Sequence, residues 1–354
     1  MTHFCTCHTI SSAVSSPVIS FAIHSSSSPV QQPLSVLLHA HDVPVHFRER
    51  EVRIEIQDFR RLLDAVSSLP LADRLDLRAV PYTAEGASIW DVHPLHIWAE
   101  RFSSSWFEQA TKSLVFHGQP IVELQTGHVV AYEALVRAHL GAELVGAEPL
   151  LKAAVAHDQT RAFDALARTT AIRQLYCKLT PAQSLFINFA PGVIYNPDIC
   201  LQTTFQACRE VGADFSRLVF EITEGEAFPD MRLLKSILER YRAEGARVAL
   251  DDLGSGRTSL SYLAELKPDI VKLDRGLIQG LHQSKPGFRL VQSLVEYAHD
   301  LRIQVVAEGI EKLEELVAVK EAGVDLVQGY YLGRPAGVLA GISPEAAVWW
   351  GAQE

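Results

Sequence analysis

From residue 114 onward, short runs of apolar, β-prone residues recur, and most are separated by segments long enough for a helix. The runs are 114–124, 129–136, 185–189, 218–222, 248–250, 270–273, 303–307 and 326–327. Helical spacing of apolar residues lies between several of them, as in 231–244 and 288–299. Alternation of strands and helices predicts an α/β fold. Eight strands over about 225 residues match the size of a (β/α)8 barrel.

The main alternative to a closed barrel is a doubly wound open sheet. Such a sheet usually needs fewer strands, and it often carries a G-x-G-x-x-G turn after its first strand. No such turn follows the run 114–124. The pattern therefore favours a TIM-like barrel.

Polar side chains lie near the carboxyl end of every run from the second to the eighth. They are Glu133, Asn188, Glu221, Asp251, Asp252, Lys272, Glu308 and Gln328. An isolated Asp-Asp pair is usually a solvated loop or a helix cap. The repetition over successive strands is different, because the carboxyl ends of parallel strands meet at one mouth of a barrel. We expect these side chains to form one site there.

The predicted site contains five carboxylates and neither histidine nor cysteine. Carboxylates this close together would repel one another unless cations lay among them. Oxygen ligands suit hard divalent ions, which favours Mg²⁺ or Mn²⁺ over Zn²⁺. Two such ions can hold a phosphoryl group and activate a water molecule for in-line attack. Asp251 and Asp252 are adjacent and could reach two neighbouring ions.

These residues lie in motifs that resemble those of the EAL domain family, the phosphodiesterases specific for cyclic di-GMP. The motifs are Glu133-Ala134-Leu135-Val136-Arg137 (E-A-L-x-R), Ile187-Asn188-Phe189, Glu221-Ile222-Thr223-Glu224 (E-x-T-E), Asp251-Asp252-Leu253-Gly254-Ser255-Gly256 with Ser259-Leu260 (D-D-F-G-x-G and S-L), Lys272-Leu273-Asp274 (K-x-D), Val306-Ala307-Glu308-Gly309-Ile310-Glu311 (V-A-E-G-V-E) and Gln328-Gly329-Tyr330 with Pro335 (Q-G-Y…P). The resemblance covers residues 106–340 and follows the family's order. It implies an EAL-type barrel whose first strand is antiparallel.

The resemblance also implies a reaction, the hydrolysis of cyclic di-GMP to linear pGpG with Mg²⁺ or Mn²⁺, which lowers the level of this bacterial second messenger. The residues that match metal ligands of the family are Glu133, Asn188, Glu221, Asp251, Asp252 and Glu308. Asp251 would bridge two ions. Lys272 would orient or deprotonate the attacking water, and Gln328 would position water or metal ligands. Glu133, Asp251, Glu308, Lys272 and Gln328 would thus form the catalytic set.

Substrate contacts and a loop are implied in the same way. Arg137, Leu135 and Asn188 would bind substrate, and the planar guanidinium of Arg137 suits a phosphate. Glu224 would hold the glycine-containing loop that follows Asp251 and Asp252, and that loop would contribute to a homodimer formed through the barrel. The bland alternative for Glu224 is a carboxylate at the start of a helix.

Some positions depart from the family pattern, namely Leu253, Thr258, Ala190 and Arg257. None of them is a metal-ligand position, and every ligand position is filled. An active phosphodiesterase is therefore our first hypothesis. The alternatives are a non-catalytic cyclic di-GMP receptor and a barrel hydrolase that acts on another phosphodiester. No GGDEF-like cyclase half is visible.

The N-terminal part is less informative. We expect residues 1–105 to form a small α/β module, whose role is unknown and for which regulation is one candidate, and residues 106–345 to form the barrel. Apolar residues alternate over 52–56, a helical pattern follows from Asp58, and residues 75–79 suggest another strand. The first 41 residues are serine-rich and could be a disordered, strand-poor tail or part of the module. Cys5, Cys7 and His8 fit no strong zinc pattern.

The net charge and the hydropathy of the chain exclude some classes of binding partner. The net charge of −10 disfavours nucleic-acid polymers and anionic membranes as partners. No window approaches the roughly 20 apolar residues of a membrane span, and the N-terminus lacks the basic start of a signal peptide. The chain has an odd number of cysteines, and their spacing shows no disulfide framework, which favours reduced thiols. We therefore expect a cytoplasmic protein.

Overall fold

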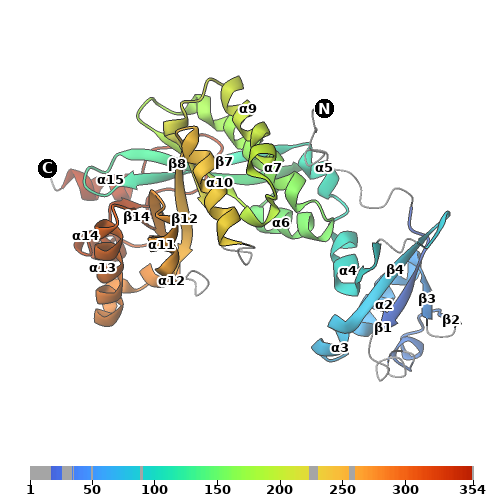
Figure 1. Ribbon diagram of the computed structural model, residues 1–354. Helices are drawn as coiled ribbons and strands as arrows, with labels where there is room; N and C mark the ends of the chain where they lie inside the picture. The colour runs from blue at the N-terminus through green and yellow to red at the C-terminus, as the bar shows by residue number, and fades with distance from the viewer. Residues whose placement is uncertain are drawn as a thin grey trace. The chain divides into compact units, whose positions relative to one another are not determined.

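The computed structural model describes residues 17–25, 34, 36–48, 51–87, 91–222, 230–254 and 260–352. The described chain forms two compact units (Figure 1). One contains residues 113–147 and those from 161 onward, and the other contains residues up to 112 together with 148–160. Within the described ranges, no helix is both long and apolar enough to cross a membrane.

The larger unit is a closed eight-stranded barrel. Its strands are β7 (Leu114–Glu123), β8 (Val129–Leu140), β10 (Ser184–Phe189), β11 (Leu218–Ile222), β12 (Arg247–Leu253), β13 (Ile270–Leu273), β14 (Gln304–Ala307) and β15 (Leu326–Val327). They pair in chain order, and β10 closes the ring by pairing with β8. β7 is antiparallel to both of its neighbours, β8 and β15. The predicted barrel with an antiparallel first strand is confirmed, and the open sheet is wrong.

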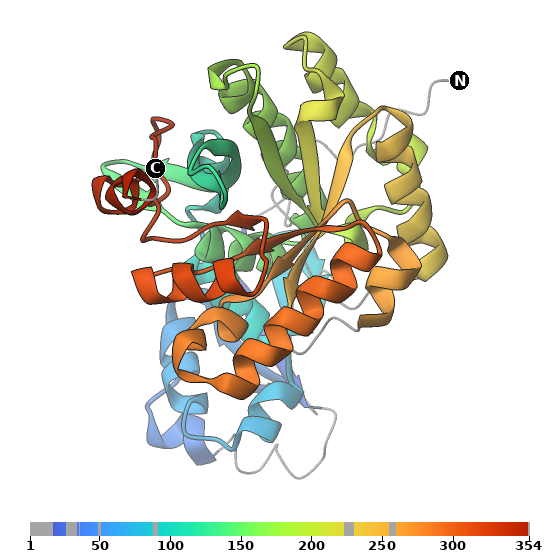
Figure 2. The same cartoon turned by 90° about the vertical axis from the view of Figure 1, so that its left-hand side faces the viewer.

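Helices lie on the outside of these strands (Figure 2). They are α7 (Thr160–Leu175), α8 (Pro197–Cys200), α9 (Gln202–Glu210), α10 (Met231–Ala243), α11 (Leu260–Leu266), α12 (Arg275–Ile278), α13 (Lys285–Asp300), α14 (Leu313–Glu321) and α15 (Pro344–Gly351). The helices predicted at 231–244 and 288–299 correspond to α10 and α13. Side chains of Asp230 and Ser284 cap their first turns, because each accepts a hydrogen bond from an otherwise unpaired backbone N–H. A short strand, β9 (Glu143–Val145), extends the sheet beyond β8.

The barrel interior holds an apolar cluster to which every barrel strand contributes one buried residue. Its members are Ile121, Ala131, Phe186, Val219, Ala249, Ile270, Val306 and Leu326. Their side chains fill the space inside the strands, as is usual in a barrel of this size. The polar residues described below lie next to this cluster inside the barrel.

The smaller unit is built on an antiparallel sheet with the order β2-β3-β1-β4-β5, and β6 pairs with β4. Its strands are β1 (Ser20–Ser25), β2 (His46–Arg48), β3 (Glu51–Glu55), β4 (Leu77–Thr83), β5 (Gly86–Ala87) and β6 (His93–Pro94). Its helices include α2 (Phe59–Val66), α3 (Leu71–Asp76), α4 (Leu95–Ser103), α5 (Phe107–Thr111) and α6 (Ala147–Ala156). Phe21, Phe59 and Trp98 belong to its apolar core.

Two expectations for this unit change. Ser20–Ser25 is a strand inside the sheet, so this part of the serine-rich segment belongs to the module. The strand expected at 75–79 begins only at Leu77, because Leu75 lies in α3. The chain at Cys5, Cys7 and His8 lies outside the described residues. The domain boundary at residue 105 stays a prediction. The residues of α6 from Glu148 onward belong to the smaller unit.

Candidate metal and phosphodiester site

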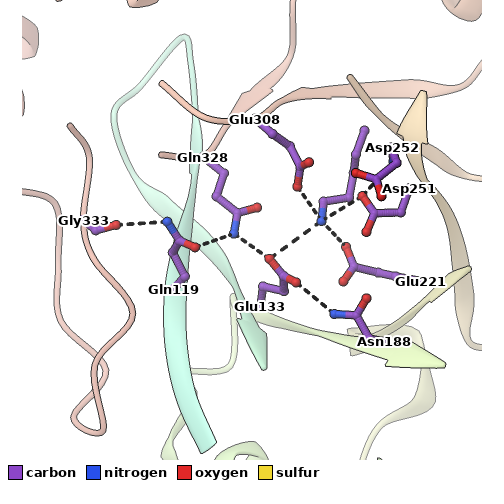
Figure 3. Close-up of polar contacts among 10 residues, drawn as sticks. Gln119, Glu133, Asn188, Glu221, Asp251, Asp252, Glu308, Gln328 and Gly333 are labelled. Carbon is purple, nitrogen blue, oxygen red and sulfur yellow. Dashed lines mark hydrogen bonds and ion pairs between the residues drawn. The ribbon is translucent and has the colours of Figure 1, made fainter. Parts of the chain in front are cut away.

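The predicted site residues follow the apolar cluster at a fixed spacing. In each parallel strand, the residue two positions after the cluster member is polar: Glu133, Asn188, Glu221, Asp251, Lys272, Glu308 and Gln328. Successive side chains of a strand point to opposite faces, so residues two apart share one face. The polar residues therefore lie next to the cluster inside the barrel and meet at its carboxyl end (Figure 3).

Lys272 lies at the centre of the site. Its side chain is 1% exposed, and its Nζ lies 2.6 Å from Glu308 Oε1 and 2.8 Å from Glu221 Oε1. The same Nζ lies 3.3 Å from Asp251 Oδ1 and 3.7 Å from Glu133 Oε2. Side chains from five different strands or strand ends thus meet around one ammonium group.

Glu133 is held by two amides. Asn188 Nδ2 donates to Glu133 Oε1 at 2.8 Å, and Gln328 Nε2 donates to Glu133 Oε2 at 2.7 Å. Burial alone would raise the pKa of Glu133, but Lys272 and these two amides lower it below its usual value. The two amides therefore hold the Glu133 carboxyl group in place through both of its oxygens.

The other carboxyls have raised pKa values. Burial raises the pKa of Glu221 well above its usual range, and Lys272 offsets this only in part. Burial also raises the pKa of Glu308 to about 8 and that of Asp252 to about 6, in the latter case with help from Asp251. A single ammonium group therefore does not offset the charge of these carboxylates, and the site favours added cations.

Asp251, Asp252 and Glu308 could hold such a cation. One carboxylate oxygen of each lies within 4.8 Å of the others. Asp252 has the left-handed backbone angle φ of +57°, next to an irregularity in the pairing of β12 with β13. This conformation is uncommon for residues other than glycine, although aspartate adopts it more readily than most, and it is often found at functional sites.

The donor set fits hard divalent ions. Oε2 of Glu221 and Oε1 of Gln328 are buried and have no hydrogen-bond partner among the described residues. Buried oxygens without a partner cost free energy that a cation or an ordered water would recover. Carboxylate and amide oxygens are the ligands that Mg²⁺ and Mn²⁺ prefer.

The other predicted residues are those expected to bind substrate or to hold the loop after Asp252. Leu135 and Arg137 follow Glu133 at alternate positions of β8 and are half-buried. Arg137 donates from Nη1 to the backbone oxygen of Val136 at 2.8 Å. Glu224 and the loop residues 255–259 lie outside the described residues, so their predicted roles stay predictions.

One member of the site was not predicted from the sequence. Gln119 of β7 is buried and accepts a hydrogen bond from Gln328 Nε2 at 3.2 Å. It lies opposite Glu133 in the β7–β8 pairing and two positions before the cluster residue Ile121. In β7 the site residue precedes the cluster residue, whereas in the other strands it follows. The order is reversed because β7 runs antiparallel to its neighbours. An amide inside the apolar run 114–124 was the available signal.

The chain is similar to a known protein family and to several known proteins. The model of the EAL domain family matches residues 105–335. A relative named cyclic di-GMP phosphodiesterase NbdA, from Pseudomonas aeruginosa, is 30% identical over 226 residues, which cover 63% of this chain and 29% of the relative. The chain spans only about a quarter to a third of the length of the curated relatives it matches first.

Solved structures are similar as well. A standalone EAL protein from Vibrio cholerae O395, crystallised with c-di-GMP bound, is 36% identical and superposes with a TM-score of 0.61, covering 66% of this chain and 97% of the other. BlrP1 from Klebsiella pneumoniae, at 20% identity and a TM-score of 0.60, covers 92% of this chain and 98% of the other. At that identity it indicates fold alone.

Proposed function

This chain belongs to the EAL domain family, and we propose that it is a metal-dependent phosphodiesterase that hydrolyses cyclic di-GMP to linear pGpG. One observation carries the proposal. The acidic, amide and lysine residues of the family motifs gather at the carboxyl end of the barrel, where Asp251, Asp252 and Glu308 bring carboxylate oxygens within 4.8 Å of one another. The names of similar proteins support the same substrate.

Two ions would be held by Glu133, Asn188, Glu221, Asp251, Asp252 and Glu308, with Asp251 as the shared ligand. When bound, Mg²⁺ or Mn²⁺ would supply Lewis-acid stabilisation of the phosphoryl oxygens and a lower pKa for water. Asp251 and Asp252 are consecutive near the end of β12, which would let them reach two neighbouring ions.

The chain's own side chains would orient the attacking water and bind the substrate. Lys272 Nζ, 2.6 Å from Glu308 and 2.8 Å from Glu221, would orient the attacking water and offset the charge that develops on the phosphate. Arg137 would bind a phosphate of the substrate, with Leu135 and Asn188 completing the substrate contacts. Asn188 and Gln328 hold the Glu133 carboxylate in place by donating to its two oxygens.

The test is direct incubation of the purified protein with cyclic di-GMP and Mn²⁺, followed by chromatographic separation of the dinucleotides. We expect pGpG to appear with Mn²⁺ or Mg²⁺ and not with EDTA. Asp251→Asn is the loss-of-function variant. Intact cyclic di-GMP after long incubation with either metal would contradict the proposal.

The same experiment separates the alternatives. If cyclic di-GMP stays intact but binds in calorimetry, the protein is a receptor. If it neither binds nor reacts, a different phosphodiester is the substrate. The filled ligand positions favour catalysis, because each carboxylate of the motifs is retained. The homodimer through the barrel and the cytoplasmic location stay predictions.

A further inference from the structure

Gln119 lies in the site but outside the sequence motifs quoted above. Its side chain is buried in β7, and it connects a backbone carbonyl to the carboxylate site (Figure 3). Gln119 Nε2 donates to the backbone oxygen of Gly333 at 3.2 Å, and Gln119 Oε1 accepts from Gln328 Nε2 at 3.2 Å. Gln328 Nε2 also donates to Glu133 Oε2 at 2.7 Å.

The direction of this chain of hydrogen bonds is fixed by chemistry. A backbone carbonyl can only accept, so Gln119 must turn its NH₂ group toward Gly333 and its oxygen toward Gln328. Gln328 must then turn its own NH₂ group toward Gln119. At the other end of the chain, Gln328 Nε2 lies 2.7 Å from Glu133 Oε2, and this contact with a carboxylate oxygen requires the same orientation.

Both hydrogens of Gln328 Nε2 are therefore used, and only Oε1 is left. That oxygen is buried and has no partner among the described residues. Rotation of the amide by 180° would bring it against the oxygens of Glu133 and Gln119. The free acceptor of Gln328 is thus the group left for a water or another ligand of the site.

We propose that Gln119 is a positioning residue, which acts through Gln328 by fixing the orientation of its amide and leaving Oε1 free for the reaction site. The catalytic part of this inference rests on the proposed function. The structural part does not, and it can be tested without substrate or metal.

The structural test measures exchange of the side-chain amide hydrogens of Gln328 in the full-length protein by nuclear magnetic resonance. Loss of the signals in Gln328→Ala assigns them. Both hydrogens should exchange at least about 10-fold more slowly than those of the exposed Gln109, because both are donated inside the barrel. In Gln119→Leu, one of them should lose this protection. Two unprotected hydrogens in the unmodified protein would overturn the proposal, even if no Gln119 variant folds.

The catalytic test is a double-mutant cycle on cyclic di-GMP hydrolysis. We expect Gln119→Leu to lower kcat about 10-fold with little change in KM, because the substrate-binding side chains stay in place. In a Gln328→Ala background the same substitution should change kcat less than about 2-fold, since its effect is transmitted through Gln328. Additive losses in the two backgrounds would overturn the proposal.

Gln174 offers a matched control. Its side chain also bridges to β7, accepting from the backbone N–H of Phe116 and donating to the backbone oxygen of Leu114. Gln174→Leu should lower stability and leave kcat unchanged. If it lowers kcat as much as Gln119→Leu does, Gln119 merely holds β7. If the unmodified protein hydrolyses nothing, the proposed function fails while the exchange measurement still decides the role of Gln119.

Discussion

The barrel and the N-terminal unit both bury a basic side chain, with opposite outcomes. In the barrel, Lys272 is shared by four carboxylates, and buried oxygens are left without a hydrogen-bond partner within the described part of the chain. In the smaller unit, Arg101 of α4 is 5% exposed and pairs with Asp158, whose side chain is 57% exposed. Arg101 also donates to the backbone oxygen of Ala156 and contacts His93 Nε2 at 3.0 Å.

This difference separates a structural ion pair from the proposed reaction site. The Arg101 pair links α4 to the segment after α6, and water solvates its exposed carboxylate. The barrel instead keeps an excess of buried negative charge that lowers stability unless cations bind. Proteins tolerate such a local cost where chemistry requires it.

The largest effect is expected for Asp251→Asn, which removes the carboxylate proposed to be shared by two ions. Hydrolysis of cyclic di-GMP should fall by at least about 100-fold, measured as pGpG release. Asp269→Asn is the control, because Asp269 accepts from the backbone of Val248 at the other end of β12. That variant should keep its rate within about 2-fold. Equal losses in the two variants would mean that the barrel as a whole had been damaged.

Lys272→Met tests the excess charge. It leaves the neighbouring carboxylates without their ammonium group, so the free energy of unfolding in EDTA should fall by about 3 kcal/mol. The loss should be smaller with saturating Mn²⁺, because bound cations replace the missing charge. Urea unfolding with and without Mn²⁺ measures both values. A loss that does not depend on metal would contradict a cation site among these carboxylates.

Asp158→Ala tests the ion pair of the smaller unit. The variant removes the carboxylate that forms an ion pair with the buried Arg101, which should cost about 2 kcal/mol in the free energy of unfolding. Arg101→Met should lower the free energy of unfolding less through lost charge, because the remaining carboxylate of Asp158 is mostly exposed and is solvated by water. Hydrolysis per folded molecule should change less than about 2-fold in either variant. A large loss of kcat at full folding would show that this pair takes part in regulation.

A smaller effect is expected from pH. Burial lowers the pKa of His93 and of His157 below the usual value, and the neighbouring Arg101 adds to this at His93. Well above pH of about 6.5, the usual pKa of histidine, both histidines are neutral in the folded and the unfolded chain. Below it the unfolded chain binds more protons, so the stability of this unit should fall until the lowered pKa is passed.

Thermal unfolding between pH 8 and pH 5 would measure this change, with His93→Gln as the comparison. The variant should show a weaker decline as the pH falls. An unchanged decline would assign the effect to His157 or to groups elsewhere in the chain.

Much of the barrel was predictable because its signals are local. The apolar runs fall on the eight strands, and the polar residue near each carboxyl end falls in the site. Predictions were poorer in the N-terminal unit. Ser20–Ser25 is flanked by serines, and its position between β3 and β4 depends on partners far along the chain.

The sequence by itself determined the family, the strand count and the residue types at the rim, since the two-residue period of a strand and the order of motifs are properties of the chain alone. The tertiary structure decided which atoms meet. Only closure of the barrel brings Lys272 within 3.7 Å of Glu133, a residue 139 positions earlier (272 − 133 = 139). Only the antiparallel direction of β7 places Gln119 beside Gln328. Such contacts depend on strand direction and register, which long-range backbone pairing sets.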